Sequence, residues 1–197
     1  MTVTQLRSFL LQLIRKHFVS PYTVYFTDEK RTRPKKPYVT LKLGTVKMST
    51  HPIVQWIDGV IVKSHPSAVK LEINLFSPGV PVKEAGVTLY QNSACDELTG
   101  LCLYFENPET EDALLDAAVS LLLEDVVRDI STILDGVEPD YRAMAEFVVD
   151  FTQTVSDPRA KKKVGSEGGG EGGTGSEGEY VNATGFFEAT EINETED

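Results

Sequence analysis

The chain has few of the residues that build metal sites or covalent catalysis. Its 197 residues include only three histidines and two cysteines. None of the histidines, His17, His51 and His65, has an acid three or four residues away in a metal-binding pattern. Cys95 and Cys102 have no histidine near them in the sequence, so they support a metal site only weakly. We therefore expect neither a metal nor another cofactor.

Other catalytic and membrane signatures are also missing. No phosphate-cradling glycine motif lies between a strand and a helix, and no Gly-x-Ser-x-Gly elbow occurs. No run is apolar for the roughly 18 residues that a membrane span needs, and the first residues lack the pattern of a signal peptide. We expect a non-enzymatic, cytoplasmically made protein. The two cysteines could close a hairpin disulfide, but free thiols are favoured in that compartment.

Positive charge is absent from the C-terminal region, and this limits the partners. Nine acidic residues and no Lys or Arg follow Lys163, and the formal net charge of the chain is −11. A nucleic-acid binder working by general electrostatics needs a basic surface, so this class is disfavoured. Eight of the fifteen residues from 165 to 179 are glycine, which predicts a flexible, self-repelling tether.

Apolar side chains return beyond this tether. They are Tyr180, Val181, Phe186, Phe187 and Ile192. Aromatics spaced along an acidic tail are typical of a docking peptide that is tied to its parent domain. The alternative is a disordered, solubilising tail. We predict a folded domain over residues 1–158 and a tether with a docking peptide over residues 159–197.

The N-terminal region predicts an amphipathic helix over residues 4–17. Thr2 and Gln5 form a plausible capping box. The apolar stripe of this helix has the spacing of one helical face and consists of Leu6, Phe9, Leu10, Leu13 and Ile14.

Alternation of apolar and polar residues predicts a mainly antiparallel sheet of about four to six strands. The clearest segments are 22–26, 38–43, 69–75 and 143–151. The apolar region 53–62 has Asp58-Gly59 in its middle, which predicts either a bulge or a tight hairpin turn, and we favour the bulge.

A second helix is predicted after Asn107, because Pro108 follows this N-cap and an apolar stripe runs over residues 113–122. Residues 77–106 look like an insertion. Within it, 87–90 and 101–105 are predicted to pair as a hairpin that carries both cysteines. The expected class is α/β (α+β), with two helices covering the sheet.

A basic, proline-rich loop precedes the strand at residue 38. Its lack of interleaved aromatics makes a nucleic-acid platform less favoured than a solvated loop or a contact to an acidic protein neighbour. We predict a protein-interaction role for its cations, which are Lys30, Arg31, Arg33, Lys35 and Lys36.

Three segments together resemble the neck or tail terminator proteins of tailed bacteriophages. They are Arg-Pro-Lys-Lys-Pro-Tyr-Val-Thr-Leu at 33–41, Lys-Leu-Glu-Ile-Asn-Leu-Phe-Ser at 70–77, and the run at 140–151 that begins Asp-Tyr-Arg-Ala. The resemblance covers roughly residues 1–155, and none of its segments is a catalytic signature. The insertion at 77–106 and the region after Pro158 depart from the family pattern.

This resemblance implies a structural virion protein that assembles as a homo-hexameric ring at the head-proximal end of the tail. Its expected partners are other copies of itself, the tail tube and the neck or connector proteins, with the sheath protein as a further candidate. DNA would only pass through the lumen, and no membrane is involved. The residues alone leave two alternatives open: a monomeric protein-binding module that uses the acidic tail, and a small enzyme whose site is dispersed in the sequence.

Overall fold

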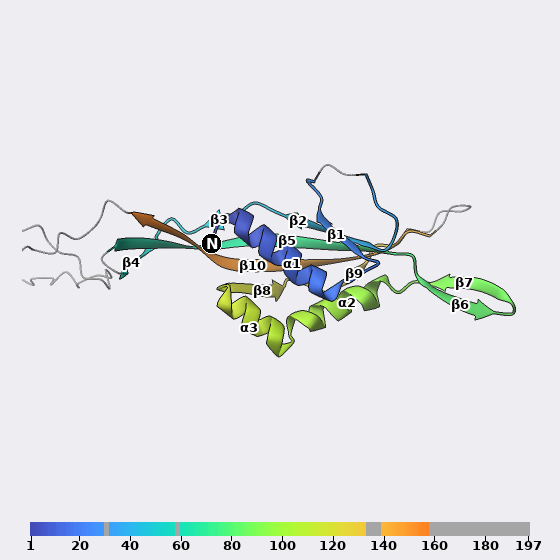
Figure 1. Cartoon of the computed structure of the whole chain (residues 1–197). Helices are drawn as coiled ribbons and strands as arrows, with labels where there is room; N and C mark the ends of the chain where they lie inside the picture. Colours follow the sequence, from blue (N-terminus) through green and yellow to red (C-terminus); the bar gives the residue numbers. More distant parts are fainter. Residues whose placement is uncertain (30–31, 58–59, 133–138, 158–197) are drawn as a thin grey trace, which may run out of the picture. The chain divides into compact units, whose positions relative to one another are not determined.

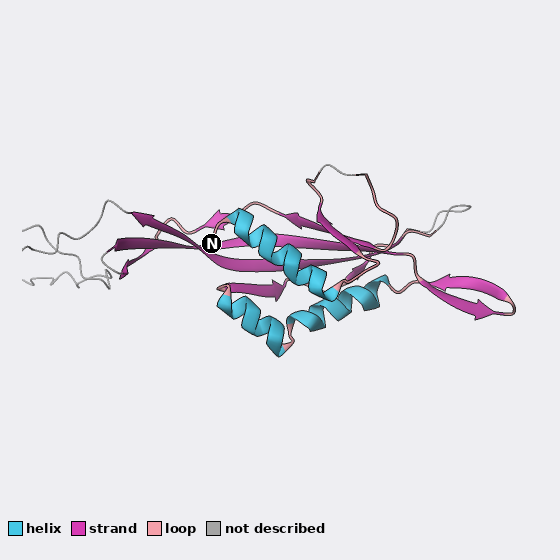
Figure 2. Cartoon of the chain, in the orientation of Figure 1, coloured by secondary structure: helices cyan, strands magenta, loops and turns pink. Residues whose placement is uncertain are grey.

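The computed structural model describes residues 1–29, 32–57, 60–132 and 139–157. Their elements confirm the predicted mixed class, with three helices and a mainly antiparallel sheet (Figures 1 and 2). In chain order the elements are α1 (Val3–His17), β1 (Thr23–Phe26), β2 (Tyr38–Leu43), β3 (Lys47–Met48), β4 (Ile53–Ile57), β5 (Val60–Ser77), β6 (Val80–Glu84), β7 (Val87–Gln91), α2 (Ala94–Phe105), α3 (Pro108–Asp116), β8 (Val119–Leu123), β9 (Arg128–Asp129) and β10 (Tyr141–Asp157).

The chain divides into two compact units, which we describe separately. The first comprises Met1–Ser49 and Pro66–Gln153, and the second comprises Thr50–His65 and Thr154–Asp197. The predicted boundary near residue 158 falls where the described residues end, so it stays a prediction. None of the helices in the described ranges has the length and apolar content that crossing a membrane requires.

Eight strands form one sheet, which is more than the four to six predicted. The main path runs β1-β2-β5-β10-β8, with β3 and β4 paired to β5 and β9 paired to β10. Only the β1–β2 pair is parallel among the registers that are defined. The count rises because β5 and β10, with 18 and 17 residues, each pair with several short strands.

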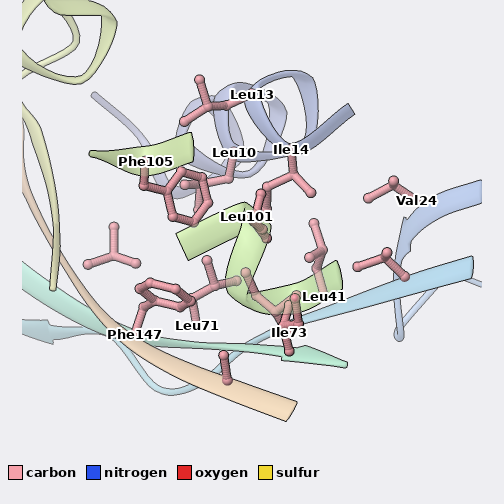
Figure 3. Packing of buried hydrophobic residues seen from close by; sticks show 14 of the residues in the cluster. Leu10, Leu13, Ile14, Val24, Leu41, Leu71, Ile73, Leu101, Phe105 and Phe147 are labelled. Atoms are coloured by element: carbon pink, nitrogen blue, oxygen red, sulfur yellow. The ribbon is translucent and has the colours of Figure 1, made fainter. Parts of the chain in front are cut away.

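The hydrophobic core of the first unit lies between the helices and one face of this sheet. Figure 3 shows Leu10 and Ile14 of α1 near Leu101 of α2, with strand residues below them. All three of these leucine and isoleucine side chains are fully buried. The capping box of α1 is confirmed, because the Thr2 hydroxyl accepts from the Gln5 amide and the Thr2 amide donates to the Gln5 side chain.

The predicted strand at 101–105 is wrong, because these residues form the second half of helix α2. A short apolar run fits either a strand or a helix. Over the whole segment Ala94–Phe105 the buried residues repeat with helical spacing, and this longer pattern distinguishes the two. The buried side chains of α2 lie on one helical face and are Ala94, Leu98, Leu101 and Phe105. Cys95 and Cys102 are therefore helical residues, and both are free, partly buried thiols.

The predicted helix after Asn107 begins as expected but ends early. The Asn107 side chain accepts from the Glu109 amide, and Pro108 is the first helical residue. The helix stops at Asp116, and Ala118 has a φ of +52°, which turns the chain. The remaining part of the apolar stripe is strand β8, which is antiparallel to β10. Strand pairing has overridden the helix propensity of this alanine- and leucine-rich run.

The described part of the second unit is a β-hairpin with a short extension at residues 154–157. Strand β4 pairs with residues 60–64 of β5, and Ile57 is opposite Val60. The two strands therefore form a hairpin, and the favoured prediction of a bulge within one strand is wrong. The Asp58-Gly59 pair itself lies outside the described residues.

Candidate assembly interface

The basic loop is partly engaged with the chain's own Asp140. The Lys36 Nζ lies 2.7 Å from Asp140 Oδ1, and the Arg33 Nη2 lies 3.4 Å from Oδ2. Lys35 is exposed. The other two predicted contact residues, Lys30 and Arg31, lie outside the described residues. Of the described cations in this loop, Lys35 is therefore the best placed to meet a partner.

Arg33 also packs on aromatic rings of the sheet. Tyr38 and Phe76 are directly opposite each other on β2 and β5, and their rings stack with centroids 4.4 Å apart. The Arg33 guanidinium lies 5.2 Å from the Phe76 centroid and donates to the Tyr38 hydroxyl. Tyr38 alternates with Val39, which is part of the helix-covered core, so this stack lies on the opposite face of the sheet.

The charge of Asp140 is favoured by this arrangement. Partial burial acts to raise the pKa of its carboxyl, but the hydrogen bond from Lys36 and the nearby Arg33 charge outweigh burial, and the pKa is lowered. The carboxylate therefore clamps the loop against the start of β10 at neutral pH. Two of the five cations predicted to bind a neighbour have this internal role.

The predicted docking residues of the tail all lie outside the described residues. They are Tyr180, Val181, Phe186, Phe187 and Ile192. Their role stays a prediction.

The β6–β7 hairpin is the most exposed apolar feature of the first unit. It forms a separate two-stranded sheet, and every residue of both strands is exposed. The register places Val82 opposite Leu89 and Glu84 opposite Val87. Alternation therefore gathers one aliphatic face, whose side chains are 40–59% exposed and belong to Val80, Val82, Val87 and Leu89.

Polar contacts hold the root of this hairpin. The Tyr141 hydroxyl donates to the Tyr90 carbonyl at 2.7 Å, and the Ser77 hydroxyl donates to a Glu97 carboxylate oxygen at 2.8 Å. The Tyr22 hydroxyl donates to the other Glu97 oxygen at 2.7 Å, and burial together with this bond raises the pKa of Tyr22. Hydrogen bonds thus hold the hairpin at its base, whereas both of its strands are exposed to solvent along their length.

The second unit exposes apolar residues on its own hairpin. All of β4 is exposed, including Ile53, Val54, Trp56 and Ile57, whose exposed fractions are 41–48%. Alternation places Ile53 and Ile57 on one face of this hairpin and Val54 and Trp56 on the other, so both faces expose apolar side chains.

One edge of the large sheet is closed by side chains. Thr23 and Thr27 donate toward β2, so the polar groups of Val24 and Phe26 face outward. The Val24 carbonyl accepts from Arg15 at 2.9 Å. The Phe26 amide donates to the Glu29 side chain at 3.4 Å, and its carbonyl accepts from the Glu29 amide at 3.1 Å. At these two residues, three of the four outward backbone groups of β1 are thus engaged within the chain, namely both groups of Phe26 and the Val24 carbonyl.

The other edge of the sheet is open. Strand β8 pairs with β10, and no strand in the described ranges pairs with its second edge. The Glu124 amide donates to the Glu146 carbonyl at 2.8 Å, which fixes the alternation of the ladder. The N–H and C=O groups of Leu121 and Leu123 therefore point away from β10.

A groove of about 480 Å³ runs beside this open edge. Its walls include Phe105 of α2, Leu115 of α3 and Leu123 of β8, with Cys102 also in the lining. Leu115 is 77% exposed, the highest fraction among the exposed large hydrophobic residues of the described ranges. The acidic side chains of the groove are Glu106, Glu111 and Asp112.

The histidines and cysteines do not gather into a reactive cluster. Within the residues that the structure describes, no group of three or more His, Cys, Asp or Glu side chains is placed to hold a metal ion. His17 packs between Phe18 and Tyr104, and burial lowers its pKa. Burial also raises the pKa of both Cys95 and Cys102, so these thiols are poor nucleophiles at neutral pH.

The sequence patterns predicted only half of the β6–β7 hairpin and did not predict the open edge of β8. The alternation Val80-Pro-Val82, then Ala85-Gly86, then Val87-Thr-Leu89 has the form of a hairpin, but only its second half was recognised. The open edge at β8 could not be found, because its strand was interpreted as helix. Comparisons with protein-family models and with curated proteins gave no match.

Proposed function

We propose that this chain is a ring-forming structural protein of a phage tail, of the neck or tail terminator type. The main observation in support of this proposal is the aliphatic face of the β6–β7 hairpin, which is exposed to solvent although hydrogen bonds hold the base of the hairpin. A two-stranded hairpin without cover is marginal in water. A neighbouring copy that covers this face would stabilise it.

A closed ring also needs a second, different surface on each copy, because a head-to-tail interface joins two unlike patches. The open edge of β8, with its groove and exposed Leu115, is a different apolar surface of the first unit, which a segment of a neighbouring copy can cover. The β4–β5 hairpin of the second unit offers further apolar area. These features support assembly with other copies and with tail-tube and connector proteins, as the resemblance of residues 33–41, 70–77 and 140–151 implies.

The mass of the purified full-length protein tests this proposal. We expect light scattering to give a multimer, with six copies as the expected number. The chain offers a matched pair of variants on the hairpin. Leu89→Asp puts a charge on the aliphatic face, and Thr88→Asp puts the same charge one residue earlier, on the opposite face.

We expect Leu89→Asp to reduce the multimer to monomer and Thr88→Asp to leave its mass unchanged. Both positions are exposed, so the free energy of unfolding should change by less than about 0.5 kcal/mol in either variant. The proposal would be wrong if the wild-type protein is a strict monomer and mass spectrometry does not find it in purified virus particles. That outcome would favour the monomeric binding module instead.

A further inference from the structure

We propose that the open edge of β8 binds residues 180–190 of a second copy as an added strand, with the side of that strand that carries Phe187 entering the groove beside α3. The inference rests on the proposed ring only in that a second copy must be close. It assigns a specific receptor and a specific register of contact to the C-terminal segment.

The receptor has both parts that strand addition requires. Main-chain groups supply the affinity in this mode of binding, and pockets for alternate side chains supply the specificity. The outward N–H and C=O groups of Leu121 and Leu123 are the main-chain part. The apolar groove on the helix-covered side, lined by Phe105 and Leu115, is the side-chain part.

The opposite edge of the sheet argues that the edge of β8 is open for a reason. Arg15 and Glu29 engage three of the four outward backbone groups of β1 at Val24 and Phe26. Edges that are not used are commonly blocked in this way, because an open edge invites pairing with other chains. The same sheet therefore has one blocked edge and one open edge with an apolar groove.

The sequence of the C-terminal segment has the pattern of a strand for such a site. Val181, Ala183, Gly185, Phe187 and Ala189 alternate with residues that are polar except for one phenylalanine at 186. The first set is entirely apolar and places its largest side chain at Phe187. The segment contains no proline, so each of its amides can donate to a neighbouring strand.

The tether has a suitable length for delivery from a neighbouring copy. Residues 158–179 separate the described part of the chain from Tyr180. A flexible chain of this length has a root-mean-square span of about 23–28 Å. The radius of gyration expected for a domain of about 150 residues is roughly 15 Å, so the span of the tether exceeds this radius and reaches the near side of an adjacent small domain.

The charges around the groove predict how salt concentration changes this docking. The groove is rimmed by Glu106, Glu111 and Asp112, and the incoming segment carries Glu188 and is flanked by more acids. Added salt screens the repulsion between like charges, so it should strengthen this docking. If instead the basic loop of a second copy occupied the groove, salt should weaken the contact.

Cys102 is a native reporter, because it lies in the groove, and Cys95 is an internal control on the same helix outside the groove lining. We would alkylate the full-length protein with iodoacetamide at a pH near 8.5 and quantify both thiols by peptide mass spectrometry. A segment that binds at about 0.1 mM and is held at about 1 mM by its tether protects Cys102 about tenfold. Cys95 should react at the same rate throughout.

The adjacent phenylalanines provide a matched pair of tail variants. We expect Phe187→Asp to raise the rate at Cys102 about tenfold, toward the unprotected rate, and Phe186→Asp to leave most of the protection. Raising the salt concentration from 50 to 500 mM should slow alkylation of Cys102 in the wild type. Equal effects of the two aspartates, or faster alkylation in high salt, would overturn the proposed register and occupant.

A matched pair on β8 tests the receptor. The Leu123 amide faces outward, so Leu123→Pro removes a donor from the open edge and keeps the ladder to β10. We expect this variant to lose protection of Cys102 with little change in melting temperature. The amide of Leu122 faces β10, so Leu122→Pro should lower the melting temperature. Full Cys102 protection in folded Leu123→Pro protein would refute strand addition.

Co-expression tests delivery by a second copy. Phe187→Asp chains are made together with an excess of Cys102→Ser chains whose tails are intact. In mixed multimers, the intact tails should restore protection of the only Cys102 present. Unrestored reactivity in multimers shown to be mixed would refute second-copy delivery. Multimers in which Cys102 reacts equally fast in wild type and Phe187→Asp protein would refute the docking and leave the ring proposal standing, whereas a monomer refutes the ring and with it this delivery.

Discussion

Gly79 and Gly86 are a matched pair of positions at which alanine substitutions can test how the β6–β7 hairpin is held. Both have a φ of +79°, so alanine would be strained at either position. A Cβ on Gly86 would meet no atom within 4 Å. A Cβ on Gly79 would lie 2.7 and 2.9 Å from two ring carbons of Tyr141 and 2.8 Å from the Gln91 carbonyl. The two substitutions therefore differ clearly in packing.

The cost of each substitution follows from these contacts. Left-handed backbone costs an alanine about 1–2 kcal/mol, and the stiffer unfolded chain returns about 0.4–1 kcal/mol. Gly86→Ala should thus destabilise by about 0–1.6 kcal/mol. Gly79→Ala must also move the ring of Tyr141, which is 8% exposed and part of the core. Overpacking of this kind costs about 1–3 kcal/mol more.

Urea unfolding followed by circular dichroism measures both values. We expect Gly79→Ala to have the lower free energy of unfolding by about 1–3 kcal/mol, which corresponds to a melting temperature lower by roughly 2–12 °C. Tyr141→Phe is a useful third variant, because it removes the hydrogen bond to Tyr90 and leaves the ring in place.

Equal free energies of unfolding for the two alanine variants would contradict the packing of Tyr141 against Gly79. That result would mean that the root of the hairpin is not packed against Tyr141 in solution. The hairpin would then be free to hinge at Gly79, and its use as a fixed assembly surface would lose its structural basis.

Further measurements address the core, the loop and the first helix. Leu101→Ala should lower the free energy of unfolding by about 2–5 kcal/mol in urea titrations, because its fully buried side chain joins α2 to the sheet. Asp140→Asn should cost less than about 1 kcal/mol at pH 7, since its partners Lys36 and Arg33 are partly exposed. Folding lowers the pKa of Asp140, so its contribution to the free energy of unfolding is present above its unfolded pKa of about 3.9 and is lost as the pH falls through the lower folded value. In acid titrations, the difference in free energy of unfolding between wild type and Asp140→Asn should therefore shrink as the pH falls. A difference that stays constant would contradict the clamp. Thr2→Ala should cost about 0.5–2 kcal/mol by loss of the cap on α1, and no change in thermal unfolding would contradict that role.

Much of the fold followed from local patterns that have one physical interpretation. The stripe of α1, its capping box at Thr2 and the strict alternation at residues 69–75 predicted their elements, because burial of one face fixes the period. The N-cap at Asn107 was equally clear. The α+β class is confirmed for this reason, although the sheet has more strands than expected.

The errors lie where a short apolar run permits two structures. Residues 101–105 were interpreted as strand and are helix, whereas residues 119–122 were interpreted as the end of a helix and are strand. Neither run is long enough for its period to decide. The choice depends on β10, whose long edge accepts Val119–Leu123 as a partner, and on the core beneath α2, which accepts Leu101 and Phe105.

The sequence was enough to predict the helices and strands with a strong period, and it shows directly the acidic composition and the glycine-rich run at residues 165–179. These features depend only on neighbours along the chain. The sequence also named the basic loop, but not that Lys36 and Arg33 hold Asp140, more than 100 residues away. Tertiary structure alone decided which sheet edge is blocked and which is open. Backbone polar groups are the same in every strand, so only the pairing of distant segments leaves those of Leu121 and Leu123 without a neighbour among the described strands.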